Sequence, residues 1–213
     1  MHAVIVANGP IGLPESFLHY ADNADHIIAA DGGANLCAKA GYIPHTLIGD
    51  LDSIDPQLLE QYRQQGVTIH RHPARKNATD LELALDMALA ASATDVDLFG
   101  ATGGRWDMSL SNISLACHEK YRAIAIAIHD HSTHMQILHQ GSHVVEAAIG
   151  STVSLLPIRG DVHGVSLEGF EYPLDKEDLH FGTSRGLSNV MEEERATIRF
   201  SSGVLAVIRS IDP

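Results

Sequence analysis

The chain has 213 residues, of which 45% are hydrophobic and 19% are charged, a composition typical of a folded globular protein. Its 27 acidic and 14 basic residues give a formal net charge of -13, which repels a phosphate backbone and argues against a nucleic acid partner. The longest apolar runs, such as residues 123–128, are far shorter than the ~20 residues that cross a bilayer, and the start lacks a basic region with a cleavage site. We therefore expect no membrane partner and a cytoplasmic location.

Short apolar runs alternate with helical patterns through the first 131 residues. The expected strands are residues 2–7, 26–30, 45–48, 67–70, 96–99 and 123–128. The expected helices lie between them, at about 14–21, 34–41, 56–65, 79–93 and 108–119. This alternation predicts an α/β domain with a mostly parallel sheet and helices on both faces. Because ligands bind outside the carboxyl ends of such strands, we expect the functional site there.

The pattern changes after about residue 131, where helical periodicity gives way to short alternating segments with frequent glycine. The expected strands are residues 135–139, 143–147, 152–156, 162–167, 197–201 and 204–209. Such segments predict a small all-β sandwich. We therefore expect two domains, 1–131 and 132–213. About eighty residues make a marginal core alone, so the second domain is expected to pack against the first or against a second subunit.

Aspartates follow several of the expected strands. Asp50 and Asp52 are two positions apart, so their carboxylates project the same way if the segment is extended. Asp80 follows Thr79 at the start of an apolar helical stripe, which places its side chain at a helix N-terminus. Three carboxylates at the mouth of a sheet suit a hard cation such as Mg²⁺ and the phosphates it carries. This pattern predicts metal-dependent phosphoryl or diphosphoryl transfer, with a helix-capping turn at residues 50–53 as the alternative.

Two glycine-containing turns also follow expected strands. The first is Asp31-Gly32-Gly33, and the second runs from Gly100 to Asp107. The chain contains neither G-x-x-x-x-G-K-[ST] nor G-x-G-x-x-G, so a nucleotide would be held in another way. Strand-to-helix turns bind phosphate through free N–H groups, although glycine also simply ends strands. Lys76 lies close enough in sequence to Asp80 to reach a shared phosphate.

Five segments taken together resemble the thiamine pyrophosphokinase family. They are ADGGAN (30–35), GDLDS (49–53), KNATDLELAL (76–85), GATGGRWD (100–107) and LSN (187–189). The resemblance covers both halves of the chain and implies a nucleotide- and metal-binding α/β domain followed by a thiamine-binding β-sandwich. It further implies transfer of a diphosphoryl group from ATP to thiamine with Mg²⁺, giving AMP and thiamine diphosphate. The implied assembly is a homodimer in which each active site is built between subunits.

The resemblance also implies a role for each matching residue. Asp50, Asp52 and Asp80 would hold the metal and the phosphates, and Asp31 would shape the same crevice, so these four are the expected catalytic residues. The expected nucleotide-binding residues are Asn8, Gly32, Gly33, Lys76, Thr102, Gly103, Gly104, Arg105 and Asp107. The expected thiamine-binding residues are Tyr172, Ser188 and Asn189.

Two positions depart from the family pattern. Met108 stands where many members have a histidine or another polar residue after R-x-D, and Gly169-Phe170-Glu171-Tyr172 stands where some have G-L-K-W. Tyr172 can still stack on a cationic heterocycle, because an aromatic face attracts positive charge.

Two alternatives stay open. One is a related diphosphokinase that acts on a pterin alcohol, and the other is a non-catalytic module that senses a nucleotide or thiamine. Tyr172 and the acidic net charge favour thiamine as the acceptor. Asp50, Asp52 and Asp80 favour catalysis, because binding alone does not need so many metal ligands.

Overall fold

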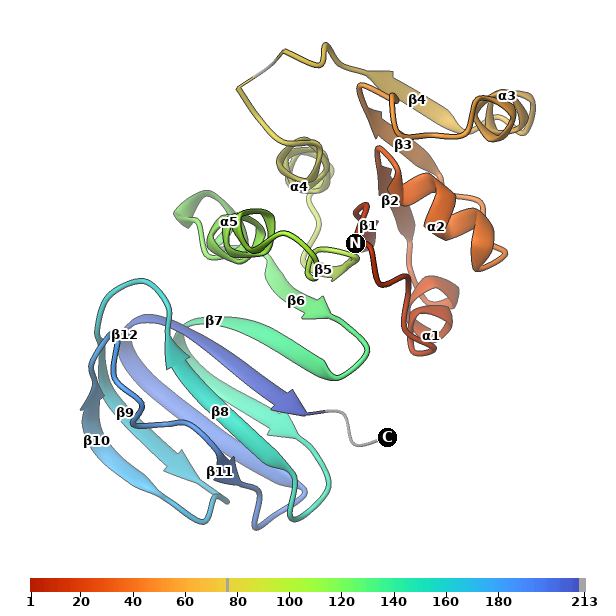
Figure 1. Ribbon diagram of the computed structural model, residues 1–213. Helices are drawn as coiled ribbons and strands as arrows, with labels where there is room; N and C mark the ends of the chain where they lie inside the picture. Colours follow the sequence, from red (N-terminus) through yellow and green to blue (C-terminus); the bar gives the residue numbers. More distant parts are fainter. Residues whose placement is uncertain (76, 211–213) are drawn as a thin grey trace. The chain divides into compact units, whose positions relative to one another are not determined.

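The computed structural model describes residues 1–75 and 77–210 (Figure 1). Lys76, one of the expected nucleotide-binding residues, lies outside the described residues. The chain forms two compact units, the first spanning Met1–His131 and the second beginning at Ser132. In the part of the chain described, no helix is long and apolar enough to cross a bilayer.

The first unit contains a parallel sheet. Its strands are β1 (His2–Val6), β2 (His26–Ala30), β3 (Thr46–Gly49), β4 (Thr68–Arg71), β5 (Asp95–Phe99) and β6 (Ala125–His129). Their spatial order is β4-β3-β2-β1-β5-β6, and every neighbouring pair runs parallel. The chain moves outward from β1 in one direction as far as β4 and then returns to the other side of β1. This order creates a topological switch point between β1 and β5, the position where open α/β sheets form a ligand crevice.

Helices cover both faces of this sheet (Figure 1). They are α1 (Phe17–Asp22), α2 (Gly33–Lys39), α3 (Pro56–Gln64), α4 (Asp80–Ala90) and α5 (Trp106–Ala116). On one face, Val4 and Val6 share a buried cluster with Phe17 of α1, Cys37 of α2 and Tyr62 of α3. On the other face α4 packs against β1, β2 and β3. Side chains that alternate along β1 therefore contact helices on both faces, which explains why residues 3–6 of this strand are all apolar and buried.

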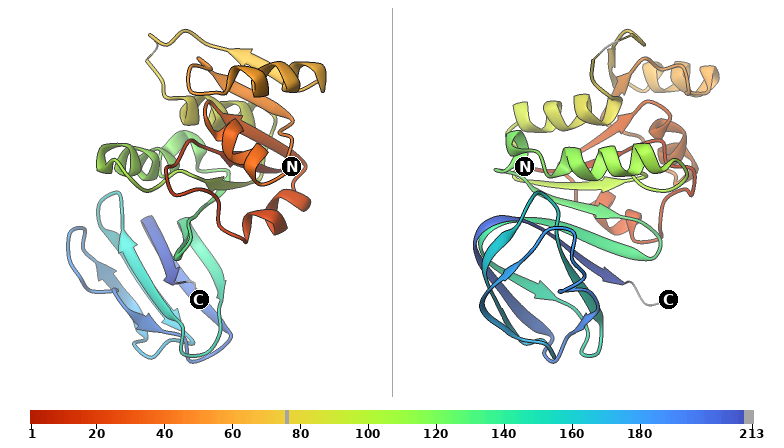
Figure 2. Two further views of the ribbon diagram at one scale, coloured as in Figure 1. Left: turned by 45° about the vertical axis from the view of Figure 1, so that its right-hand side comes forward. Right: turned by 60° about the vertical axis from the view of Figure 1, so that its left-hand side comes forward.

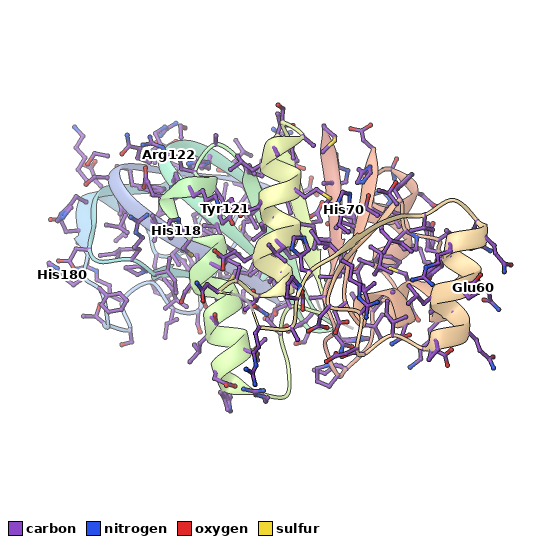
Figure 3. All side chains as sticks on the ribbon, turned by 90° about the horizontal axis from the view of Figure 1, so that it is seen from above. Glu60, His70, His118, Tyr121, Arg122 and His180 are labelled. Carbon is purple, nitrogen blue, oxygen red and sulfur yellow. The ribbon has the colours of Figure 1, made fainter. Side chains whose placement is uncertain are left out.

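The helix expected to run to about residue 119 ends earlier. After α5 ends at Ala116, a separate 3-10 turn covers Glu119–Tyr121. His118 caps this turn, since its Nδ1 accepts a hydrogen bond from Lys120 N at 3.1 Å. Tyr121 and the capping His118 are labelled in Figure 3. Tyr121 is buried and donates its hydroxyl to Asp86 Oδ1 on α4 at 2.6 Å. This hydrogen bond holds the turn against a neighbouring helix. It joins residues far apart in the sequence, so a local helical pattern could not predict it.

The second unit is antiparallel throughout. Strand β12 (Arg195–Ser210) pairs along its length with β7 (Thr133–Glu146) (Figure 2). The other edge of β12 pairs first with β9 (Val162–Glu168) and then with β8 (Thr152–Pro157). Two more strands complete the unit, β10 (Leu174–Leu179) beside β9 and β11 (Asn189–Val190) beside β8. A cluster of buried side chains from these strands, including Leu155, Leu179 and Phe200, forms the core.

Two pairs of expected strands are each one long strand. The expected segments 135–139 and 143–147 lie in β7, apart from residue 147, and 197–201 and 204–209 lie in β12. Two glycines fall between the expected segments and lie inside the long strands, Gly141 with φ +144° opposite Phe200 and Gly203 with φ +107° at a register shift. Glycine adopts these angles at little cost, so the paired strands bend without separating. The sequence pattern also missed β10, whose LDKEDL segment has only two apolar residues and lies at the edge of the unit.

A buried carboxylate in the first unit joins two histidines. Oδ2 of Asp97 lies 2.6 Å from Nε2 of His2, and Oδ1 lies 2.5 Å from Nε2 of His129. The Asp97 side chain is 13% exposed and that of His129 is 2% exposed. Burial by itself raises the pKa of the Asp97 carboxyl, but the hydrogen bonds and charges of His129 and His2 outweigh it and hold the pKa below its ordinary value.

We expect stability at acidic pH to depend on Asp97. Because its folded pKa is lowered, the ionised carboxylate stabilises the fold above the ordinary aspartate pKa of about 4, and this contribution is lost as the pH falls through the lower folded pKa. In denaturant titrations between about pH 5 and pH 3, the wild type should lose more unfolding free energy than Asp97→Asn. The control is Asp95→Asn, an exposed position on the same strand, which should keep the wild-type slope. Equal slopes for wild type and Asp97→Asn would contradict this assignment.

Candidate active site

Three carboxylates converge at the carboxyl ends of β2 and β3. Asp31, Asp50 and Asp52 each place one oxygen so that the three atoms lie within 4.8 Å of one another. Within residues 1–75 and 77–210, this is the one group of three or more histidine, cysteine or acidic side chains close enough to share a metal ion. The ligand atoms are carboxylate oxygens, without thiolate or imidazole, which is the donor set that Mg²⁺ prefers.

The backbone holds these carboxylates in an unusual conformation. Asp31 has φ +46°, and its N–H donates to the carbonyl of Ile48 on β3 at 2.9 Å. Leu51 has φ +67° and is buried, so Asp50 and Asp52 flank an anchored apolar side chain. The N–H of Asp52 donates to Asp50 Oδ1 at 3.2 Å. Left-handed backbone at a non-glycine residue costs on the order of 1 kcal/mol and concentrates at functional sites.

Asp80 joins the same place from α4. Thr79 caps this helix as expected, since its hydroxyl oxygen accepts from Glu82 N at 3.2 Å. A Cβ placed on Gly49 would lie 3.0 Å from Asp80 Oδ1 and 3.2 Å from Asp31 Cβ. The Asp80 carboxylate therefore lies beside Gly49 and Asp31, in space that a larger residue at position 49 would fill.

The helix-capping alternative for residues 50–53 is wrong. The cap of α3 is Asp55, whose Oδ1 accepts from Gln57 N at 2.8 Å and from Leu58 N at 3.2 Å. Asp50 and Asp52 therefore do not serve as the helix cap, and their convergence with Asp31 needs another explanation.

Residues that the sequence analysis did not select support the acidic loop. Asn35 Nδ2 donates to the Ser53 carbonyl at 2.8 Å, and Asn35 Oδ1 accepts from Asp55 N at 3.2 Å. Ser53 in turn donates its hydroxyl to Asp52 Oδ1 at 3.0 Å. Lys39 lines an open pocket of about 600 Å³ together with Asp52 and Asn35. The position of Asn35 in the ADGGAN segment was the available signal for its role, whereas nothing in the sequence marked Lys39.

Three turns meet at the switch point between β1 and β5. A Cβ on Gly32 would lie 2.4 Å from the Asn8 side chain, and one on Gly33 would lie 2.0 Å from the Val6 carbonyl oxygen. A Cβ on Gly103 would meet Ile11 at 2.6 Å, and one on Gly104 would meet Pro10 at 2.9 Å. The structure thus brings the turn that contains Asn8 against the two glycine turns. A side chain at Gly33 would collide with backbone, and one at Gly32, Gly103 or Gly104 would displace a neighbouring side chain. Thr102 lies half-buried in the second turn.

Arg105 and Asp107 form an ion pair at the start of α5. Arg105 Nε lies 3.0 Å from Asp107 Oδ1, and Nη2 lies 2.5 Å from Oδ2. Both side chains are more than half exposed, and the hydrogen bond from Arg105 holds the pKa of the Asp107 carboxyl below its ordinary value. Asp107 is not part of the group formed by Asp31, Asp50 and Asp52, so the structure does not bring all the strand-end aspartates to one point.

The second unit contains a pocket of about 550 Å³. Tyr172 and Asn189 line it, and Ser188 is not among its lining residues. Ser188 has φ +55°, and its N–H donates to Ser154 Oγ at 3.0 Å. Three charged residues that no sequence pattern marked also line this pocket, Glu171, Glu177 and Arg185. Arg185 pairs with Glu177, so Glu171 supplies a further negative charge beside the exposed Tyr172 ring.

Comparison with known proteins finds the same family in both units. The family model for the catalytic domain of thiamin pyrophosphokinase matches residues 17–128, and the model for its vitamin B1 binding domain matches residues 142–205. A thiamine pyrophosphokinase of Bacillus subtilis is 35% identical over 209 residues, covering 98% of each chain. A solved structure of thiamine pyrophosphokinase from Bacillus subtilis superposes with a TM-score of 0.89 at 33% identity, covering 100% of both chains. A thiamin pyrophosphokinase structure from Geobacillus thermodenitrificans gives a TM-score of 0.86 at 32% identity, covering 100% of this chain and 98% of the other.

Proposed function

This chain belongs to the thiamine pyrophosphokinase family, and from that membership we propose that it transfers a diphosphoryl group from ATP to the hydroxyl of thiamine, with Mg²⁺, giving AMP and thiamine diphosphate. The observation that carries the proposed chemistry is the convergence of Asp31, Asp50 and Asp52 beside Asp80. Carboxylates held this close repel one another, and a divalent cation relieves that repulsion. The site therefore suits a metal that carries phosphates.

In this proposal Asp50, Asp52 and Asp80 hold Mg²⁺, and Asp31 shapes the crevice beside them. The bound metal would neutralise the charge on the phosphates and on the departing AMP. The chain itself supplies positioning: the backbone at Asp31 and Leu51 fixes the carboxylates, and Asn35 anchors the loop that carries them. Diphosphoryl transfer needs little covalent help from protein, so such positioning accounts for much of the catalysis.

The proposed nucleotide site lies at the switch point between β1 and β5. Backbone N–H groups of glycine turns bind phosphate oxygens because no side chain blocks their approach. Arg105 would add a positive charge at the start of α5. The full set consists of Asn8, Gly32, Gly33, Thr102, Gly103, Gly104, Arg105 and Asp107, together with Lys76 on the basis of sequence alone.

The proposed thiamine site is the pocket of the second unit. Thiamine is a cationic heterocycle, and the exposed Tyr172 ring beside Glu171 offers both an aromatic face and a negative charge. Ser188 and Asn189 complete the proposed set. The proposed metal site belongs to the first unit and the pocket to the second, so transfer requires the two to meet. We propose, from the family resemblance, that they meet between the subunits of a homodimer.

We further propose that the two units are an α/β nucleotide domain and a β-sandwich thiamine domain, and that the enzyme works in the cytoplasm. Cys37 is a free and buried thiol, as suits a reducing compartment. The alternatives of a pterin diphosphokinase and a non-catalytic sensor are not favoured, because the relatives described above are named as thiamine pyrophosphokinases.

The direct test is incubation of the purified protein with ATP, Mg²⁺ and thiamine, followed by mass spectrometry of the products. We expect AMP and thiamine diphosphate in equal amounts, and neither product when EDTA removes the metal. A parallel reaction with a pterin alcohol serves as the acceptor control. If only the pterin alcohol is converted, the acceptor is a pterin and not thiamine. If ATP binds and no AMP forms, the result supports the non-catalytic sensor.

A further inference from the structure

One buried side-chain amide holds both backbone groups of Tyr172. Asn189 Oδ1 accepts a hydrogen bond from Tyr172 N at 3.0 Å, and Asn189 Nδ2 donates to the Tyr172 carbonyl at 2.9 Å. The same Oδ1 also accepts from Val190 N at 2.9 Å. Asn189 is 3% exposed. It therefore acts on Tyr172 as a neighbouring strand would, through one donor and one acceptor.

These bonds leave Asn189 little capacity for a ligand. An amide oxygen has two acceptor positions, and both are occupied by backbone N–H groups. One of the two amide N–H groups is used as well, and the residue is almost fully buried. A direct contact with thiamine would therefore rest on a single remaining N–H.

The ring of Tyr172, in contrast, is available. It is 60% exposed and lines the pocket of the second unit. The preceding residues are also held against the Asn189 segment, since Glu171 N donates to the Val190 carbonyl at 2.9 Å and Phe170 forms a bridge with Met191. Tyr172 is the last residue in this row, because Pro173 has no N–H to continue it. The ring is exposed, and its hydroxyl interacts with the neighbouring Glu171, whose hydrogen bond and charge raise the Tyr172 pKa. Because both side chains belong to this short segment, its backbone sets where the ring lies.

We propose that Asn189 is a positioning residue that fixes the backbone of Tyr172, so that the tyrosine ring is presented to the thiamine heterocycle. Asn189 then affects thiamine binding through Tyr172 and not through a contact of its own. This inference rests on the proposed function. The inference assigns different roles to Asn189 and Tyr172, whereas the family resemblance implied that both contact thiamine.

A double-mutant cycle with steady-state kinetics tests the proposal. Asn189→Ala and Tyr172→Ala should each raise the KM for thiamine by about tenfold, with kcat and the KM for ATP changed by less than about twofold. The double variant should be no worse than the more severe single variant, because both changes remove the same interaction. If the two effects multiply, Asn189 contacts thiamine independently and the positioning role is overturned.

Loss of Asn189 also leaves two backbone N–H groups without their acceptor, which lowers stability. Val165→Ala, in the core of the same unit, is the control: it should lower the melting temperature while leaving the KM for thiamine unchanged. Asn189→Asp retains the acceptor for both N–H groups and loses the donor to the Tyr172 carbonyl. It turns a carboxylate oxygen toward the Tyr172 carbonyl oxygen, so it should also raise the KM for thiamine, and it replaces the alanine variant in the cycle if that variant does not fold.

Hydrogen exchange separates this inference from the proposed function. The amide of Tyr172 should exchange faster in Asn189→Ala than in the wild type, whatever the activity of the protein, because alanine removes the acceptor of that N–H. Unchanged exchange at Tyr172 would overturn the positioning role. A wild type that makes no thiamine diphosphate would instead overturn the proposed function, with the exchange result still deciding whether Asn189 holds Tyr172.

Discussion

Replacing Asp52 with asparagine is expected to reduce kcat by about two to three orders of magnitude, with a melting temperature close to that of the wild type. Asp52 is exposed and its carboxylate belongs to the proposed metal site. The amide keeps the shape of the side chain and an oxygen that can accept from Ser53, but it removes the negative charge that a hard cation requires. Steady-state kinetics over a range of Mg²⁺ concentrations, with thermal unfolding of the same preparations, measures both quantities.

A control for charge lies three residues away in the same loop. Asp55→Asn also removes one negative charge, but Asp55 caps α3, and asparagine caps a helix as well as aspartate does. This variant should keep activity within about twofold of the wild type. Mg²⁺ should raise the melting temperature of the wild type and of Asp55→Asn more than that of Asp52→Asn, because a ligand that binds the folded state stabilises it. Full activity in Asp52→Asn would remove this residue from the mechanism.

Gly100→Ala is expected to be among the most destabilising single changes in the first unit, lowering the free energy of unfolding by about 3–4 kcal/mol. Gly100 has φ +63°, and a Cβ there would lie 2.3 Å from the carbonyl oxygen of Ala7. The new methyl group would be strained by the backbone angle and would also collide with backbone at the end of β1. Because β1 and β5 border the proposed nucleotide crevice, separating them should also raise the KM for ATP.

Gly41→Ala separates the cost of the backbone angle from the cost of the collision. Gly41 has φ +80° just after α2, and a Cβ there would meet nothing within 4 Å. This variant carries the same kind of backbone strain without a collision, so we expect a loss of about 1 kcal/mol. Denaturant unfolding at neutral pH gives the two values. If Gly100→Ala costs no more than Gly41→Ala, the close approach of β1 and β5 is not a determinant of stability.

Local patterns in the sequence were sufficient to predict most strands and helices of the first unit. The strand expected at residues 26–30 is β2, His26–Ala30, and the cap expected at Thr79 begins α4. These features depend on neighbours a few positions away: an apolar run for a buried strand and a hydroxyl for a helix end. The sequence also predicted that aspartates would follow the strands, because that pattern is visible in the chain itself.

Features that depend on residues distant in the sequence could not be predicted from local patterns. The expected strands stopped on either side of Gly141 and Gly203, yet β7 and β12 continue through these positions and pair with each other on both sides of them. Asn189 was expected to contact thiamine, and its part in holding Tyr172 emerged only from hydrogen bonds between residues 17 positions apart. The sequence shows the same asparagine whether its side chain contacts a ligand or holds a neighbouring backbone.

The sequence by itself determined the order of strands and helices, the change to antiparallel structure after about residue 131, and the family to which the chain belongs. The tertiary structure alone decided which aspartates meet. Asp31, Asp50 and Asp52 converge, with Asp80 beside them, because β2 and β3 are neighbours and the backbone turns left-handed at Asp31 and Leu51. Asp107 pairs instead with Arg105 at the start of α5. Convergence depends on strand order and backbone angles, and neither is encoded in the spacing of the acidic residues.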